Sequence, residues 1–180
     1  LPMKGLITKG IGGFYYVDTG ADIIEAKGRG ILKKDGLILA VGDKVEVEII
    51  DDAGNKGIIN SIYPRKNQFI RPPIVNVDTF VVVFAAAKPK PNLVLVDKFL
   101  IMAEMHNVEA VVCINKCDLV TPKTIEEYRA VYESVYPVVT ISAGTGQGLD
   151  ELKDAISGKT AALAGPSGVG KSTIINALVP

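Results

Sequence analysis

Eight residues near the end of the chain have the types and spacing of a phosphate-binding loop. They run from Gly165 to Ser172 as Gly-Pro-Ser-Gly-Val-Gly-Lys-Ser, which fits a glycine, four variable positions and then Gly-Lys-Ser. Glycines allow backbone conformations that turn successive N–H groups toward one anion, and the start of a helix adds partial positive charge there. We therefore expect this loop to bind the phosphates of a nucleoside triphosphate.

Two side chains of the loop have a predicted role in the chemistry at the phosphates. Lys171 would reach the β- and γ-phosphates as a point charge, and the Ser172 hydroxyl would bind Mg²⁺. These two are the catalytic candidates of the chain, and Ser172 is its candidate metal ligand. The alternative interpretation is a glycine-rich turn that binds nothing. The phosphate-binding residues expected here are Gly165, Pro166, Ser167, Gly168, Val169, Gly170, Lys171, Ser172 and Thr173.

A second set of polar residues follows two other apolar runs and can read a nucleotide base. Asn115-Lys116-Cys117-Asp118 comes directly after the run 110–114, and Ser142-Ala143 follows the run 138–141. The Asp118 carboxylate can accept both the ring N1–H and the exocyclic amine of guanine. Adenine lacks that donor pair and would leave the carboxylate unpaired, which disfavours an ATP-dependent enzyme.

The neighbouring residues of both motifs are expected to support guanine binding. The stem of Lys116 can lie along the base plane, Asn115 can brace the loops, and the Ala143 N–H can donate to the guanine O6. The base-binding residues expected are therefore Asn115, Lys116, Cys117, Asp118, Ser142 and Ala143.

Residues 79–180 alternate between predicted strands and helices. The run 80–86 is almost wholly apolar, as in a strand buried on both faces of a parallel sheet. Asn92 can cap a helix that continues to about residue 106, and Thr121-Pro122 can begin another that includes Val135. The pattern predicts a doubly wound α/β domain, whose ligands bind beyond the carboxyl ends of its strands.

The order of the motifs along the chain is unusual. Ordinary GTPases place the phosphate loop first and the base-reading motifs later, whereas here residues 115–118 and 142–143 precede residues 165–172. A circular permutation keeps the sheet and moves the chain ends, which exposed loops tolerate. We therefore predict a P-loop GTPase domain with circularly permuted motif order.

The first 63 residues have a different pattern, with short strands separated by glycine and aspartate. Candidate strands are 4–8, 13–18, 23–26 continued by 30–33, 44–50 and 57–62. Five short strands without a helical period predict a small closed barrel, most commonly an OB-fold. The proline- and arginine-rich residues 64–78 are expected to form a linker between the domains.

Such a barrel can bind nucleic acid through aromatic and basic side chains on one face. The residues that could supply this face are Tyr15, Tyr16, Lys27, Arg29, Lys33 and Lys34. The alternative is that the aromatic residues partly fill the barrel core while the basic residues are simply solvated. Both interpretations stay open at this point.

The amino-acid composition excludes few classes of function. The chain has 180 residues, 48% of them hydrophobic, and its 20 basic side chains equal its 20 acidic ones. Bulk charge therefore gives no sign of nucleic-acid binding. No apolar run is long enough to span a bilayer and the chain does not open on a signal-peptide pattern, so we expect a cytoplasmic protein without a membrane partner. Two cysteines are too few for a zinc cluster.

Taken together, these motifs resemble the ribosome small subunit-dependent GTPase A family. The resemblance covers residues 3–180 and includes Gly28-Arg29-Gly30, Val41-Gly42-Asp43, Pro64-Arg65-Lys66-Asn67, Arg71-Pro72-Pro73 and Asn76-Val77-Asp78. It implies an OB-fold that contacts ribosomal RNA, hydrolysis of GTP to GDP stimulated by the small ribosomal subunit, and a role in late maturation of that subunit. A monomer is expected.

The resemblance also implies elements that these 180 residues do not contain. They are a threonine-bearing switch, an Asp-x-Pro-Gly switch and a zinc-binding domain, so we expect a C-terminally truncated family member. Zinc is expected for the full-length protein, with ligands outside this sequence. No residue here is assigned to positioning the attacking water, which leaves turnover by these residues alone open. The second hypothesis is an RNA-binding module in which guanine nucleotide is only a conformational ligand.

Overall fold

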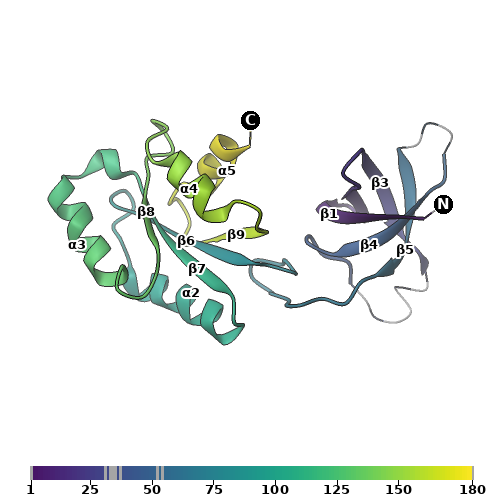
Figure 1. Cartoon of the computed structure of the whole chain (residues 1–180), viewed down its shortest axis with the longest axis horizontal. Helices are drawn as coiled ribbons and strands as arrows, with labels where there is room; N and C mark the ends of the chain where they lie inside the picture. Colours follow the sequence, from purple (N-terminus) through teal and green to yellow (C-terminus); the bar gives the residue numbers. More distant parts are fainter. Residues whose placement is uncertain are drawn as a thin grey trace. The chain divides into compact units, whose positions relative to one another are not determined.

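The chain folds into two compact units, Leu1–Val77 and Asp78–Pro180 (Figure 1). This computed structural model describes residues 2–30, 32, 36, 38–51, 53 and 55–179. Among the described residues, the helices are all too short or too polar to traverse a lipid bilayer.

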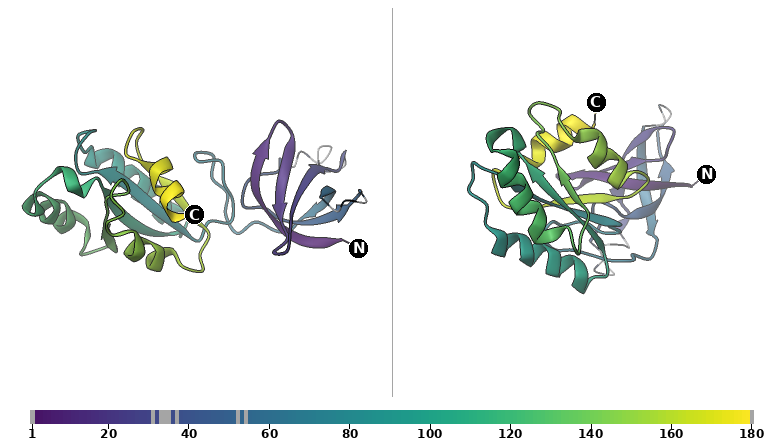
Figure 2. Two further views of the ribbon diagram at one scale, coloured as in Figure 1. Left: turned by 90° about the horizontal axis from the view of Figure 1, so that it is seen from above. Right: turned by 60° about the vertical axis from the view of Figure 1, so that its left-hand side comes forward.

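The first unit is a closed five-stranded barrel. Its strands are β1 (Met3–Ile11), β2 (Phe14–Asp18), β3 (Ile23–Gly28), β4 (Lys44–Ile49) and β5 (Lys56–Ile62). They close in the order β1-β2-β3-β5-β4, in which β3 and β5 are parallel and the other pairs are antiparallel. Figure 2 shows these purple-to-blue strands curling around one another. The predicted OB-fold is confirmed.

Apolar and polar side chains alternate along the strands, and the apolar ones form the barrel core. On β4, Val45 and Val47 are fully buried while the intervening glutamate faces outward, as the period of two requires. Ile7, Val17, Ile24 and Ile59 from β1, β2, β3 and β5 join them in the interior. Apolar side chains from all the strands therefore meet inside the closed sheet.

One predicted strand segment is wrong. Strand β3 ends at Gly28, and Gly30 and Leu32 are helical instead of extended, while residues 31 and 33 of the expected segment lie outside the described residues. The N–H of Leu32 donates to the carbonyl of Arg29 at 3.0 Å. This turn brings the Leu32 side chain into the barrel core beside Leu39. Burial of that leucine outweighs continuation of the strand.

The predicted linker is largely packed onto the barrel. The Arg65 guanidinium donates to both carboxylate oxygens of Asp43 at 2.7 and 2.8 Å, and Asp43 is fully buried. The Asn67 side chain bonds both the N–H and the carbonyl of Val77 at 2.8 Å. Asn76 donates to the carbonyl of Gly42 at 2.9 Å. Residues 64–77 therefore belong to the first unit, because their polar side chains satisfy buried groups of the barrel.

The second unit contains a four-stranded parallel sheet. Its strands are β6 (Thr79–Ala85), β7 (Glu109–Asn115), β8 (Val138–Thr140) and β9 (Ala161–Ala164), in the order β8-β7-β6-β9. Every residue of the central strand β6 is buried, as its apolar run predicts.

Helices cover both faces of this sheet (Figure 1). They are α2 (Leu93–Met105), α3 (Pro122–Tyr132), α4 (Leu149–Ile156) and α5 (Lys171–Leu178), together with the short 3₁₀ helix η1 (Cys117–Leu119). Helix α2 packs on β6 and β7, and the α3 ring of Tyr128 meets Phe84 edge-on with centroids 5.6 Å apart. Leu152 of α4 and Ile174 of α5 pack into the opposite face. The predicted doubly wound arrangement is confirmed.

Helix boundaries agree with the predicted caps except at one end. Asn92 accepts from the N–H of Leu95 at 3.2 Å, and Thr121 accepts from that of Thr124 at 3.3 Å. Helix α3 ends at Tyr132, so Val135 lies beyond the helix and is 71% exposed. Pro137 lies further along and disfavours helical conformation only in the residue before it, Tyr136, so it limits how far the helix could extend but does not set its end at Tyr132.

We predict that Arg65→Met lowers the free energy of unfolding of the first unit by about 3–5 kcal/mol, because it removes the cationic partner of the buried Asp43 carboxylate, which keeps its hydrogen bond from the Ala40 N–H. Denaturant titration followed by far-ultraviolet circular dichroism measures this change. The matched control is Lys159→Met, which breaks a more exposed pair with Glu109 and should cost less than about 1 kcal/mol. Equal costs for both variants would contradict the role assigned to Arg65.

Candidate nucleotide-binding site

The predicted functional segments meet at one edge of the parallel sheet. Strand β7 ends at Asn115, β8 at Thr140 and β9 at Ala164, and parallel strands present their carboxyl ends on the same side. The segments 115–118, 142–143 and 165–173, which are separated in sequence, therefore lie along one edge.

Close packing requires glycine at two positions of the phosphate loop. A Cβ atom on Gly165, whose φ is +154°, would lie 2.2 Å from the carbonyl oxygen of Val83 on β6. At Gly170, whose φ is +97°, it would lie 2.4 Å from Nδ2 of Asn115. Between them Val169 is fully buried in the core. The loop thus packs closely against two strands, and helix α5 begins at Lys171, within the motif.

The Lys171 ammonium lies across the mouth of this loop. Its Nζ donates to the carbonyl oxygens of Gly165 at 2.8 Å and Pro166 at 2.6 Å. Burial lowers the pKa of Lys171, because desolvation disfavours its charged form. The hydroxyl-bearing residues Ser172 and Thr173 are exposed in the first turn of α5. The arrangement places a partly desolvated cation and two accessible hydroxyls at the positions expected for phosphate and Mg²⁺ binding.

Asn115 joins the phosphate loop to the loop after β8. Its side chain is buried, with Nδ2 donating to the Val169 carbonyl at 2.9 Å and Oδ1 accepting from the Ala143 N–H at 3.1 Å. Asn115 therefore links the two loops, as its predicted bracing role requires. The Ala143 N–H, which was expected to donate to guanine O6, is instead bonded to Asn115, because the buried amide oxygen needs a donor. A contact with O6 would have to share or replace that hydrogen bond.

Lys116 contacts a fourth segment at this edge of the sheet, the one that contains Lys88. The position of this segment was not predicted from the sequence. The Lys116 backbone is left-handed with φ +60°, and its Nζ donates to the carbonyl oxygens of Gly168, at 2.9 Å, and of Lys88. Lys88 belongs to the Lys-Pro-Lys-Pro stretch after β6. A usable signal was present, since a proline-rich turn after a buried parallel strand must also lie at this edge.

The remaining predicted base-binding residues frame the same edge. Asp118 is exposed in η1, whereas Cys117 is buried, and that burial raises the pKa of its thiol. Ser142 is buried, and its backbone N–H and carbonyl bond the Gln147 carbonyl at 2.9 Å and the Gly146 N–H at 2.8 Å. An accessible carboxylate therefore stands beside a loop that is rigidly held.

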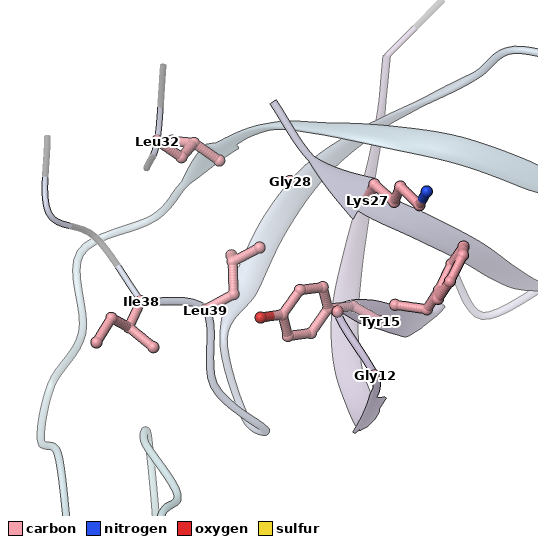
Figure 3. Close-up of a pocket in the computed structure, with 9 residues that line it drawn as sticks. Gly12, Tyr15, Lys27, Gly28, Leu32, Ile38 and Leu39 are labelled. Atoms are coloured by element: carbon pink, nitrogen blue, oxygen red, sulfur yellow. The ribbon is translucent and has the colours of Figure 1, made fainter. Parts of the chain in front are cut away.

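The barrel residues expected to share one RNA-binding face do not all do so. Tyr15 packs against the barrel core and projects toward Leu39 in a pocket of the barrel, while the Lys27 side chain points away from Leu39 (Figure 3). Tyr16 faces the opposite side of β2, where its hydroxyl donates to Glu25 at 3.2 Å and this bond raises the pKa of Tyr16. Adjacent residues of a strand point to opposite faces, so both tyrosines cannot lie on one surface.

Two of the six residues expected on that face, Lys27 and Arg29, are exposed on the barrel. Lys33 and Lys34 lie outside the described residues. A single RNA-binding face on the barrel would therefore need a different set of side chains.

Fold and site together define a class of protein. A parallel sheet carries the predicted phosphate loop and the two predicted base-reading loops at its carboxyl edge, with the phosphate loop last in sequence, and an OB barrel precedes this sheet in the sequence. This is the arrangement of a circularly permuted P-loop GTPase.

Comparison with known proteins identifies the family. The RsgA GTPase family model matches residues 62–180 and the RsgA N-terminal domain model matches residues 4–59. The Small ribosomal subunit biogenesis GTPase RsgA of Alkaliphilus metalliredigens is 48% identical over 98% of this chain and 61% of the relative. That of Caldanaerobacter subterraneus is 47% identical over 97% of this chain and 59% of the relative. The chain belongs to the RsgA GTPase family.

Solved structures agree with this assignment. YjeQ from Thermotoga maritima matches the whole chain with a TM-score of 0.86 and 35% identity, over 66% of its own length. YloQ, described as a circularly permuted GTPase, matches with a TM-score of 0.81 and 35% identity, over 65% of its length. The chain spans about three fifths of the length of the curated relatives that it matches.

We predict that Asn115→Ala lowers the free energy of unfolding of the second unit by about 2–4 kcal/mol, because it leaves the Val169 carbonyl and the Ala143 N–H unpaired. Thermal and denaturant unfolding measure the change. The control Asn92→Ala removes an exposed helix cap and should cost only about 1 kcal/mol. A cost for Asn115→Ala no greater than that of the control would show that the brace contributes little.

Proposed function

We propose that this protein binds guanine nucleotides and hydrolyses GTP in the maturation of the small ribosomal subunit. The observation that carries the proposal is the hydrogen-bonded link from Asn115 to Val169 and Ala143, since it couples a phosphate loop to a base-reading loop. The curated relatives are named as GTPases of small ribosomal subunit biogenesis, which supports the biological setting. A protein that acts on this subunit works in the cytoplasm, where we place it.

In this proposal Asp118 selects the base. Its exposed carboxylate would accept the N1–H and the exocyclic amine of guanine, while the stem of Lys116, fastened to Gly168 and Lys88, would lie along the ring. An adenine in the same position would desolvate the carboxylate without pairing it. Ser142 and Ala143 would close the other side of the base. Selectivity then follows from unpaired polar groups and not from shape alone.

Lys171 and Ser172 act at the phosphates. In hydrolysis a water oxygen bonds to the γ-phosphorus, the bond to the β–γ bridging oxygen breaks, and GDP and phosphate result. Lys171 would stabilise the negative charge on the β- and γ-phosphates. The accessible Ser172 hydroxyl would be the protein ligand of Mg²⁺, which supplies charge neutralisation when bound. No residue of this chain is assigned to orient the water.

The second candidate function is that of an RNA-binding module with guanine nucleotide as a conformational ligand only. The observation that favours it is a barrel with exposed cations on β3 and just after it, Lys27 and Arg29. Contact with ribosomal RNA through this barrel is compatible with both candidates. They differ in whether the protein turns GTP over when small ribosomal subunits are present.

We predict that Asp118→Asn changes the preference from guanine to xanthine nucleotides, because the new amide can donate to the additional xanthine carbonyl. Titration with labelled GDP, XDP and ADP measures the preference. Lys171→Ala is the matched variant, which should lose most affinity for di- and triphosphates and leave the base preference unchanged. Retained guanine preference in Asp118→Asn would remove the basis for the assignment of the base site.

We predict that Lys27→Glu combined with Arg29→Glu weakens binding to small ribosomal subunits without altering GDP affinity, because two phosphate-pairing cations are reversed. Co-sedimentation at several salt concentrations measures binding, and the affinity should also become less salt-dependent. Lys159→Glu, an exposed charge reversal in the second unit, serves as the control. In the same preparations, subunits that bind but stimulate no GTP hydrolysis would favour the second candidate.

A further inference from the structure

A groove of about 550 Å³ lies over β2, β3 and β5 of the barrel. This volume falls in the range of about 300–1,000 Å³ that is usual for ligand sites. Its lining includes Phe14, Lys27, Arg29, Ile50, Lys56 and Ile58. Of these residues, only Lys27 and Arg29 were grouped from the sequence. Lys56 and Ile58 are distant in sequence and come beside them through the parallel pairing of β3 with β5.

The charges of the groove favour an anionic occupant. Three cations, Lys27, Arg29 and Lys56, line it together with one carboxylate, that of Glu25. Glu25 already accepts the Tyr16 hydroxyl at 3.2 Å, which satisfies part of its hydrogen-bonding capacity. The nearby Asp51 carboxylate is also engaged, since it accepts the backbone N–H of Lys56 at 2.9 Å. The cations thus outnumber the carboxylate that faces the groove.

An aromatic ring in the groove favours a flat occupant. The Lys27 Nζ lies 4.4 Å from the ring centroid of Phe14, a residue that is 37% exposed. Exposed cation–π contacts are weaker than the stacking of a nucleic-acid base on an aromatic ring. A base can therefore replace the ammonium on the ring, while the released ammonium pairs with a phosphate. The exposed Ile50 and the half-buried Ile58 extend the apolar surface.

We propose that this groove binds unpaired bases of single-stranded RNA. A base stacks on Phe14, and Lys27, Arg29 and Lys56 pair with the flanking phosphates. The bases of a duplex are stacked on each other and cannot reach the ring, so the groove selects single-stranded over double-stranded RNA. This inference rests on the proposed function and specifies the form of RNA that the barrel recognises.

The test compares the full chain and its variants for binding of a fluorescein-labelled single-stranded RNA decamer and of a perfectly paired RNA hairpin. Phe14→Leu keeps an apolar side chain but removes the aromatic face, and should weaken decamer binding by roughly 5- to 150-fold. Lys56→Gln, an exposed substitution that leaves the core intact, should make the dependence of log affinity on log salt shallower by about 0.7. Hairpin binding should change little in Phe14→Leu.

The control is Tyr63→Leu, because Lys4 lies 5.5 Å from the Tyr63 ring centroid in a similar pair outside the groove. The inference is overturned if Phe14→Leu and Tyr63→Leu bind the decamer equally well, if Lys56→Gln leaves the salt dependence unchanged, or if a poly-glutamate peptide competes as well as RNA. GDP and small-subunit binding are measured on the same preparations. If the chain binds GDP and small subunits but the decamer results are not as expected, the groove assignment alone is wrong. If the unmodified chain binds neither GDP nor small subunits, the proposed function is wrong.

Discussion

The buried side-chain amide of Asn115 makes the hydrogen bonds on which the proposed nucleotide site depends. One group presents a donor to Val169 and an acceptor to Ala143, which lie 54 and 28 residues away in the chain. A single orientation of the amide therefore sets the distance between the loop for the phosphates and the loop for the base. Gly170 is part of the same constraint, because any larger residue would collide with this amide. An aliphatic side chain could fill the volume but would leave two backbone groups unpaired in the interior.

The parallel sheet explains why the motif order can be permuted without loss of the site. Each functional segment follows the carboxyl end of its own strand, and the strands are held by hydrogen bonds and apolar packing, not by the sequence of connections. The position of the phosphate loop depends on contacts of Gly165 with β6 and of Gly170 with β7. A chain that enters the sheet at a different strand meets the same geometry. The location of the loop near residue 170 is thus compatible with an ordinary nucleotide site.

Local sequence signals were sufficient to predict most of the fold and to propose the nucleotide site, whereas contacts between residues distant in the sequence could not be predicted. The loop glycines, the cap at Asn92 and the alternation on β4 each depend on a few neighbouring residues, so the sequence is sufficient to predict them. The pair Arg65–Asp43 and the hydrogen bond of Lys116 to Lys88 join residues 22 and 28 positions apart and have no local pattern. This is why residues 64–78 were interpreted as a linker, although residues up to Val77 belong to the first unit. The separation of Tyr15 and Tyr16 was predictable, because consecutive strand residues face opposite sides.

Lysine has a common physical role in the two proposed sites. Lys171 rests on loop carbonyl oxygens and Lys27 rests on an aromatic ring, so each ammonium is held by uncharged partners. A phosphate is a stronger partner than either, and an anion stabilises the charged form that burial disfavours at Lys171. The same exchange would occur with any accessible phosphate, so the lysines supply affinity without choosing the ligand. Discrimination must come from the groups beside them, the Asp118 carboxylate for the base of the nucleotide and the Phe14 ring for an unpaired base of RNA.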